Sequence, residues 1–387
     1  MANNKSFKVK NGLLASRYYG SNGTETAGST AAYDISNTSY SNVSFDVSNE
    51  ALGPTSFDFS SDGTKMYMQS SNNDAVYQYS LSTAFDISTA SYASKSFSVV
   101  SQDTIPTGLA FSSDGTKMYM CGINTDICYQ YTLSTAWDVS TASYASKTLS
   151  FVSQDGLPYN ITFNNNGTKL YMIGGTNDSV FQYSLSTAYD LSTGSYDSVS
   201  FSVSSQETAP RGITFNGNGT KMYIVGEDND SIFQYSLSTA YDLSTASYDS
   251  VSFNVSSQNG GPRQIKFNSD GTKHFIIADA GGSGERAVYE YYTTSLTQSL
   301  DLSTGNTFSF TPSGATTVSF TNPPASGLAV GFSVEINGDG SAITWPSSVK
   351  WDSGTAPTAT ASKELYTFIT TDGGTTYYGK KAAGDIA

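Results

Sequence analysis

Few side chains in this sequence are suited to acid–base or nucleophilic chemistry. His274 is the only histidine among 387 residues, and no nucleophile motif accompanies it. Because Ser-His-Asp and Cys-His catalysis need a base beside the nucleophile, the sequence predicts neither. Cys121 and Cys128 are the only cysteines, and both lie in one short segment. They predict two unpaired thiols in a reducing compartment rather than a disulfide framework.

Paired carboxylates remain as a catalytic possibility, because glycoside hydrolysis needs only two. Most acidic residues, however, recur at a fixed spacing, which is typical of turn formers rather than of a unique acid or base. Asp58 and Glu227 lie outside this pattern, and nothing in the sequence pairs them. The acidic cluster at 227–230 lacks the alternating ligands of a calcium loop. We therefore predict no enzyme activity, no metal site and no cofactor. The recurring hairpin acids are Asp74, Asp126, Asp178 and Asp230.

This recurrence comes from a kernel, Pro-x-x-x-x-Phe-x-x-(Asp/Asn)-Gly-Thr-Lys, which occurs five times with a period of 52 residues. An unvarying period of this length indicates a repeat architecture. The kernel prolines are Pro54, Pro106, Pro158, Pro210 and Pro262, and the kernel glycines are Gly63, Gly115, Gly167, Gly219 and Gly271.

Each period predicts four short strands. In the second repeat the first three are expected at Pro106–Phe111, Lys117–Met120 and Cys128–Tyr131, with a turn at the kernel glycine. A connector with an aromatic residue and an aspartate follows. The fourth strand alternates apolar and polar residues, as at Phe97–Val99. Four antiparallel strands per repeat in a tandem array describe the blade of a β-propeller.

The phase of the repeat predicts how the array ends. A connector and a fourth strand, near Val43–Val47, precede the first kernel, whereas the last kernel supplies only three strands. We therefore predict an all-β fold with a five-bladed β-propeller over residues 31–294, closed by the N-terminal strand so that no sheet edge stays open. A solenoid is the alternative, but it would need capping repeats.

Binding residues are expected where the repeat varies. The residue after the kernel proline changes most, and in a propeller it lies near the mouth of the central channel. Tyr159, Arg211 and Arg263 at this position could stack on and hydrogen-bond a sugar or a carboxylate. The plain alternative is that they are merely exposed. Trp137, a connector aromatic, is a further candidate: exposed, it would offer a stacking platform, although packing against the outer strands is the other interpretation.

Composition limits the partners. The net charge of −14 argues against binding nucleic-acid phosphates. The N-terminus has no apolar signal sequence, and no run approaches the 18 apolar residues of a membrane span, so we expect no membrane insertion.

The two ends of the chain stand outside the repeat. Phe7–Leu13 predicts a short strand, and residues 19–29 a linker, which together make an N-terminal segment of residues 1–30. From residue 295 the composition changes, and six short strands in about 90 residues predict a small, jelly-roll-like C-terminal β-sandwich over 295–387. The expected strands are Thr307–Thr311, Thr317–Phe320, Ala329–Asn337, Ala342–Trp345, Glu364–Thr370 and Thr376–Gly379.

Three stretches resemble known families. The segment Phe111–Met120 is similar to propeller repeats whose inner strand ends in Ser-x-Asp-Gly, a resemblance specific for fold. Phe7–Leu13 resembles a leader of marine bacteriophage structural proteins. The C-terminal stretches are similar to the terminal β-domain of tailed-phage fibre and appendage proteins. They are Gln298–Gly305, Ala342–Pro346, Val349–Trp351, Gly354–Pro357 and Thr371–Gly379.

The resemblance implies a virion protein assembled in the bacterial cytoplasm. It implies a tail fibre or appendage that joins other virion proteins through its N-terminal segment, binds a host cell-surface receptor such as a glycan, and forms a homotrimer. A capsid-decoration protein and a glycan depolymerase are the alternatives. The absence of a unique carboxylate pair disfavours the depolymerase.

Overall fold

A computed structural model describes residues 25–27, 32–258, 260–279, 286–293, 296–312, 316–338, 343–352 and 354–386. The strand predicted at Phe7–Leu13 lies outside this range, as do residues 281–285, where the sequence of the fifth repeat is longer than that of the others. The chain divides into two compact units. One is Gly28–Ser295, and the other combines Met1–Ala27 with Leu296–Ala387.

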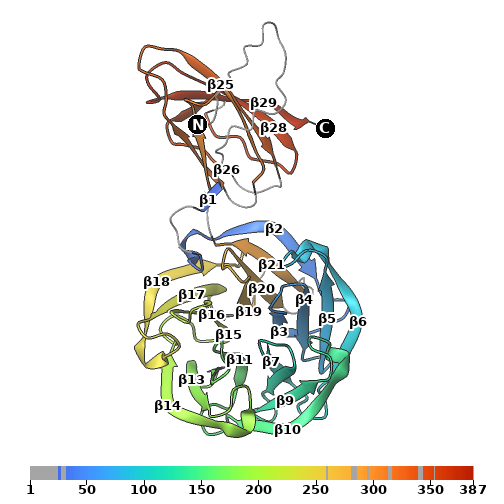
Figure 1. Cartoon of the computed structure of the whole chain (residues 1–387). Helices are drawn as coiled ribbons and strands as arrows, with labels where there is room; N and C mark the ends of the chain where they lie inside the picture. Colours follow the sequence, from blue (N-terminus) through green and yellow to red (C-terminus); the bar gives the residue numbers. More distant parts are fainter. Residues whose placement is uncertain are drawn as a thin grey trace, which may run out of the picture. The chain divides into compact units, whose positions relative to one another are not determined.

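The larger unit is a five-bladed β-propeller, as the 52-residue period predicts (Figure 1). Each blade is a four-stranded antiparallel sheet. The inner strands are β3 (Pro54–Phe59), β7 (Pro106–Phe111), β11 (Pro158–Phe163), β15 (Pro210–Phe215) and β19 (Pro262–Phe267). The second strands are β4 (Lys65–Ser70), β8 (Lys117–Gly122), β12 (Lys169–Gly174), β16 (Lys221–Gly226) and β20 (Lys273–Asp279). The third are β5 (Ala75–Leu81), β9 (Ile127–Leu133), β13 (Ser179–Leu185), β17 (Ser231–Leu237) and β21 (Arg286–Tyr292). The outer strands are β6 (Ala90–Ser98), β10 (Ala142–Ser150), β14 (Gly194–Ser202), β18 (Ala246–Asn254) and β2 (Ser39–Asp46).

The outer strands are longer than the sequence pattern indicates. In the first blade the alternation suggests only Phe97–Val99, but β6 begins at Ala90. A bulge separates its two halves: the register shifts between Gln78 and Tyr79, and Ser94 has a φ of 56°. Because a bulge shifts the side-chain alternation by one residue, a search for strict alternation detects only the half beyond it.

The connectors fold into short 3-10 helices, each capped by its aspartate. The Asp86 side chain accepts a hydrogen bond from the Ser88 backbone N–H, and the other blades repeat this cap. The aromatic residue before the aspartate covers the kernel glycine of its own blade. At Gly115, which has a φ of 69°, a Cβ would overlap the Trp137 ring. The helices are η1 (Ile35–Asn37), η2 (Ile87–Thr89), η3 (Val139–Thr141), η4 (Leu191–Thr193) and η5 (Leu243–Thr245).

Two repeated hydrogen bonds join each of the first four blades to the next. In the first blade, the buried Tyr67 hydroxyl donates to the Trp137 carbonyl at 2.8 Å, and Gln78 Oε1 accepts from the Val139 N–H at 3.1 Å. The same contacts recur at Tyr119 and Gln130, Tyr171 and Gln182, and Tyr223 and Gln234. The last pair reaches the N-terminal residues Tyr33 and Ile35. In the same sheet as β19 and β20, β2 pairs antiparallel with β21.

The C-terminal unit contains two sheets that share one core. One sheet has the order β1 (Glu25–Ala27), β22 (Leu296–Asp301), β24 (Thr316–Thr321), β26 (Ile343–Thr344). The other has the order β23 (Thr307–Phe310), β25 (Val330–Asn337), β28 (Lys363–Thr370), β29 (Tyr377–Ile386), β27 (Val349–Trp351). Val318 from the first sheet and Val334 and Phe368 from the second are buried in the same apolar cluster.

Three strands of this unit differ from the sequence prediction. Residues 25–27, expected within a linker, form β1, because their backbone pairs with Leu296–Gln298. The sequence of Leu300–Thr304 echoes the connector of the repeat, and Asp301 does accept from the Ser303 N–H as a connector aspartate would. The preceding residues nevertheless form β22, parallel to β24. β27 is too short to show alternation.

The fifth blade departs from the repeat at its second strand, where His274 replaces the Met or Leu of the other blades. His274 is fully buried, stacks on Tyr291 with ring centroids 4.9 Å apart, and its ring nitrogens have no hydrogen-bond partner among the residues that the structure describes. Burial lowers its pKa from 6.5 to about 3. The folded protein therefore keeps this imidazole neutral where the unfolded chain would protonate it, and stability is lost as the pH falls below about 6.5.

We predict that His274→Met removes this pH dependence. Wild-type stability should fall by up to about 1.4 kcal/mol per pH unit below about 6.5 because of His274, and the variant should lack that component. Denaturant unfolding between pH 7 and pH 4.5 measures the difference. Leu170→Met, at the equivalent position of the third blade, is the matched control and should leave the pH profile unchanged. Parallel profiles for wild type and His274→Met would contradict the prediction.

Candidate functional site

The five residues after the kernel prolines meet at one end of the propeller channel. They line a pocket of about 310 Å³. All inner strands begin at this end of the channel. The strand register shifts directly after the proline, so the second residue of each inner strand lies outside the regular pairing, as at Tyr159 and Arg211. The pocket brings together Tyr159, Arg211 and Arg263, three of the four candidate binding residues. Its lining is Pro54, Thr55, Ser71, Ile105, Thr107, Ile123, Tyr159, Arg211, Arg263 and Asp279.

Both arginines bind one carboxylate, that of Glu227. Arg211 donates from Nε to Glu227 Oε2 at 2.8 Å and also from Nη2, while Arg263 Nη1 contacts Oε1. The three side chains are 19–25% exposed. Charge-assisted pairs of this kind fix the geometry of guanidinium groups. Glu227, which the sequence left without a partner, therefore positions the two arginines at the pocket.

Tyr159 supports Arg211 instead of offering a stacking face. The guanidinium carbon of Arg211 lies 3.8 Å from the centre of the Tyr159 ring. Gly175 packs against the same ring so closely that a Cβ there would overlap it. A cation over a tyrosine ring is a favourable contact that restrains the arginine. The sequence predicts that Tyr159 could stack on a sugar, but the Arg211 guanidinium covers the ring face that such a sugar would need.

The other two rim positions belong to the scaffold. The Thr55 hydroxyl donates to the Pro106 carbonyl at 3.1 Å, and the Thr107 hydroxyl donates to the Pro158 carbonyl at 2.6 Å. These contacts link neighbouring blades. The pocket therefore has a threonine and isoleucine side, and a second side that carries the arginines.

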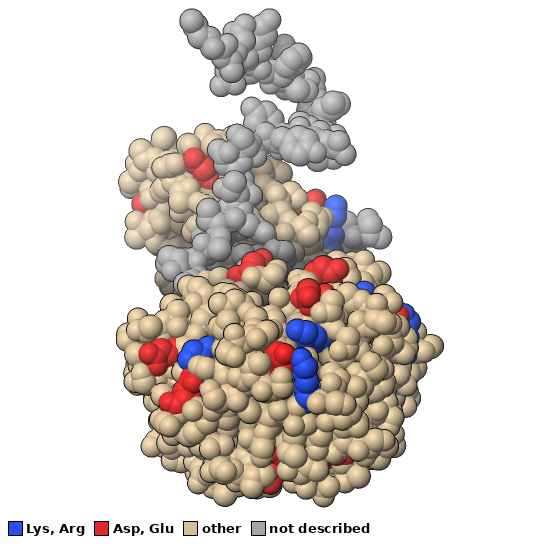
Figure 2. Space-filling view, turned by 60° about the horizontal axis from the view of Figure 1, so that its bottom comes forward, with Lys and Arg blue, Asp and Glu red and all other residues tan. Residues whose placement is uncertain are grey.

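The arginine side is locally positive although the whole chain carries −14. Two arginines against Glu227 leave one positive charge, and Asp279 lies 3.4 Å from Arg286 Nε. On the face shown in Figure 2, most of the propeller surface comes from uncharged residues, and positive and negative side chains adjoin near its middle. An anionic group is the ligand that this distribution favours.

Beneath the rim, a layer of buried polar side chains fills the channel. Asn160 Nδ2 donates to Ser56 Oγ at 3.1 Å, and Gln264 Nε2 donates to Asn160 Oδ1 at 3.1 Å; all three residues are fully buried. The remaining two strands present Gly108 and Gly212 at this level, where a Cβ would collide with Asn160 or Gln264. The pocket therefore ends at this layer.

A second off-period acid, Asp58, lies two residues further along β3. It forms an ion pair with Lys266 of β19 at 3.2 Å, and both side chains are less than one fifth exposed. Sequence reasoning had singled out Asp58 but missed Lys266 and the polar layer. Variation at the second and fourth residues after each proline was the signal that would have found them.

Trp137, the fourth candidate, lies elsewhere. Its ring covers Gly115 at the far end of the blade from the kernel proline and stacks on Tyr67, with centroids 6.2 Å apart. It also packs on Phe111 of the inner strand β7, with ring centroids 5.6 Å apart, so it lies in the apolar cluster where two blades meet.

The remaining reactive groups are structural. Cys121 and Cys128 face each other across β8 and β9 as free thiols, and burial raises the pKa of Cys121 to about 12. The recurring hairpin acids occupy turns with φ near 50°, as at Asp74 and Asp178. Within the described ranges, no three His, Cys, Asp or Glu side chains gather as a metal site. No helix in the described part of the chain is long and apolar enough to cross a membrane.

Comparison with known proteins finds distant likenesses to solved structures. No family model and no curated protein matches the chain. Among solved structures, a putative 6-phosphogluconolactonase from Bacteroides uniformis aligns with 14% identity and a TM-score of 0.39, covering 56% of this chain and 61% of that one. The β-propeller domain of Cps50 (Swd1) from Myceliophteria thermophila aligns with 8% identity and a TM-score of 0.38, covering 66% and 99%. The chain thus spans about three fifths of the first of these structures.

We predict that Asn160→Ala destabilises the propeller by about 1–3 kcal/mol, since it removes the hydrogen bond that Asn160 donates to Ser56 and leaves the buried Gln264 Nε2 without its acceptor. Chemical denaturation measures the loss. Thr162→Ala, two residues along the same strand, is the control and should cost less. Equal stability of Asn160→Ala and wild type would show that the polar layer contributes nothing.

Proposed function

We propose that this chain is a non-catalytic attachment protein of a bacteriophage virion, a tail fibre or appendage, that binds a host cell-surface glycan at the propeller rim. The observation that carries the binding role is the Arg211–Arg263 pair, held by Glu227 at the mouth of the channel. The C-terminal resemblance to phage fibre domains supports the virion assignment. Through this resemblance the N-terminal segment is proposed to join other virion proteins, and the chain to act as a homotrimer.

The rim favours recognition through charge and hydrogen bonds. Guanidinium groups present planar donors that match carboxylate, sulfate or phosphate groups. Such groups are frequent on acidic polysaccharides, which also carry hydroxyls suited to threonine and backbone contacts. Both oxygens of Glu227 already contact arginine, so this carboxylate is occupied in positioning. This occupation supports a binding role over a depolymerase.

We also infer that β2 closes the propeller ring and that the two C-terminal sheets form a β-sandwich. The pairing of β2 with β21 and the contacts of Tyr33 and Ile35 with the fourth blade support the closure. The common apolar cluster supports the sandwich.

A variant that lacks residues 1–48 tests the closure. It should expose the edge of β21, lose cooperative unfolding and self-associate, because an uncovered strand edge pairs with other chains. Size-exclusion chromatography and thermal denaturation measure both effects. A monodisperse variant with wild-type unfolding would refute the inferred closure.

The receptor role is tested with the double variant Arg211→Gln, Arg263→Gln. Purified wild-type protein in excess should slow phage adsorption to host cells by occupying the receptor. The double variant should need at least tenfold more protein for the same effect, because charge-assisted hydrogen bonds contribute about 1.5–3 kcal/mol each.

The control is Lys65→Gln with Lys117→Gln. These changes remove the same charge at the kernel turns, where the described residues show no ion pair for either lysine. This variant should compete like wild type. If wild-type protein fails to slow adsorption, the receptor role is refuted. If wild-type protein slows adsorption and the arginine variant competes equally well, the rim is not the site.

A further inference from the structure

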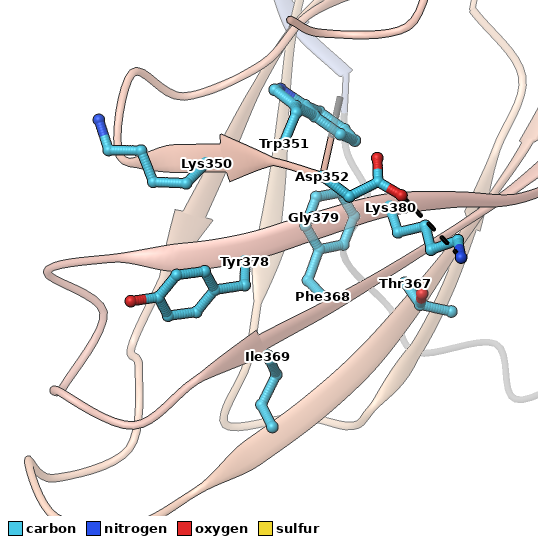
Figure 3. A pocket seen from close by; sticks show the side chains of 9 residues that line it. All are labelled: Lys350, Trp351, Asp352, Thr367, Phe368, Ile369, Tyr378, Gly379 and Lys380. Atoms are coloured by element: carbon cyan, nitrogen blue, oxygen red, sulfur yellow. Dashed lines mark ion pairs between the residues drawn. The ribbon is translucent and has the colours of Figure 1, made fainter. Parts of the chain in front are cut away.

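A shallow groove lies on the C-terminal unit, on the outer face of its five-stranded sheet. It crosses three neighbouring strands, β28, β29 and β27, and has a volume of about 600 Å³ (Figure 3). The lining residues are Lys350, Trp351, Asp352, Thr367, Phe368, Ile369, Tyr378, Gly379 and Lys380.

Strand register arranges the groove in two rows. Ile369 pairs with Tyr378, which pairs with Lys350, so that one row combines an aliphatic, an aromatic and a cationic side chain. In the next row on the same face, Thr367 pairs with Lys380, whose Nζ lies 3.9 Å from Asp352 Oδ2. Backbone of the strands forms the floor. The groove therefore offers an apolar surface with charged groups along one side.

Tyr378 is available to a ligand. It is 60% exposed, and Ile369 beside it is 45% exposed. Unlike Trp351 and Phe368, which pack into the core, the Tyr378 side chain contacts no other aromatic ring, and its hydroxyl forms no hydrogen bond within the described part of the chain. Tyr378 thus combines an open ring face with an uncommitted hydroxyl, in contrast to the covered ring of Tyr159 at the rim.

The charged groups beside Tyr378 are also weakly engaged. Lys350 has no ion pair among the described residues. The Lys380–Asp352 pair is long, with both side chains more than half exposed, and a pair of this kind contributes little. Two lysines against one aspartate leave a local positive charge, together with a carboxylate that can accept from hydroxyl groups.

The strongly exposed apolar side chains of the groove are two, Tyr378 and Ile369. Beyond Leu365, adjoining positions on the same sheet face include polar residues, with Ser333 opposite Thr367 and the Lys363–Glu335 ion pair at 3.4 Å. A stable contact between protein subunits would need a much larger apolar area. A single sugar ring, whose C–H face stacks on tyrosine while its hydroxyls and acid group reach the charged rim, matches the surface.

We propose that this groove binds one hexuronic acid unit of an acidic polysaccharide. The pyranose lies on Tyr378 and Ile369, Lys350 contacts the carboxylate, and Asp352 with Lys380 contacts the hydroxyls. This site rests on residues of the C-terminal unit alone and is independent of the propeller rim.

Calorimetric titration of the full chain tests the proposal, with trigalacturonic acid as the acidic probe and maltotriose as the neutral one. The background carries Arg211→Gln and Arg263→Gln, which removes the rim arginines. Trigalacturonic acid should bind more tightly than maltotriose. Tyr378→Ala should weaken both by roughly three- to tenfold through lost stacking. Lys350→Gln should weaken only the acidic probe.

Leu328→Ala, which removes another exposed apolar side chain of the same unit, is the matched control and should change neither affinity. No binding of trigalacturonic acid, or equal binding by Tyr378→Ala, would overturn the site. Equal affinity for both probes would overturn the acidic specificity. Concentration-dependent self-association that Tyr378→Ala abolishes would assign the groove instead to contacts between copies of the chain.

Discussion

The propeller depends on hydrogen bonds that each blade makes to the backbone of the next one. A four-stranded blade is apolar on both faces and gains stability only by packing against neighbours. Where blades meet, the Tyr67 hydroxyl and the Gln78 amide satisfy a carbonyl and an N–H of the following connector. Because these groups are buried, the loss of either partner would leave an unsatisfied polar atom. This requirement explains why tyrosine, glutamine and the connector recur together with the period.

The fifth blade shows what happens when the contact changes. Its second strand carries Phe275 where the other blades have tyrosine, and its third strand carries Glu290 where they have glutamine. Glu290 is nearly fully buried and forms an ion pair with Lys273 at 3.0 Å. Burial raises its pKa, although the lysine opposes this effect. The fifth blade thus has the least regular interior, with His274 in the same sheet.

The sequence was most informative about the scaffold. A fixed period revealed the blades and strand types, because repeated turns and apolar positions obey local rules. It could not reveal which variable positions touch, since contacts such as Arg211 with Glu227 or Asp58 with Lys266 depend on how blades surround the channel. Nor could it show that Arg211 would cover Tyr159. Bulges at residues such as Ser94, and parallel pairing of β22, were hidden because neither follows simple alternation.

The polar layer of Ser56, Asn160 and Gln264 limits how far such a ring can be symmetric. Every inner strand presents its third residue toward the same axis, and the space there accommodates three side chains of different length beside Gly108 and Gly212. Five copies of asparagine would overlap, and five glycines would leave an unfilled hole with no partners for its walls. A gene assembled from five copies of the Asn160 blade, or of the Gly108 blade, would therefore encode a defective axis. At this position the unequal side chains of the repeats complement one another, and the centre of the ring depends on that difference.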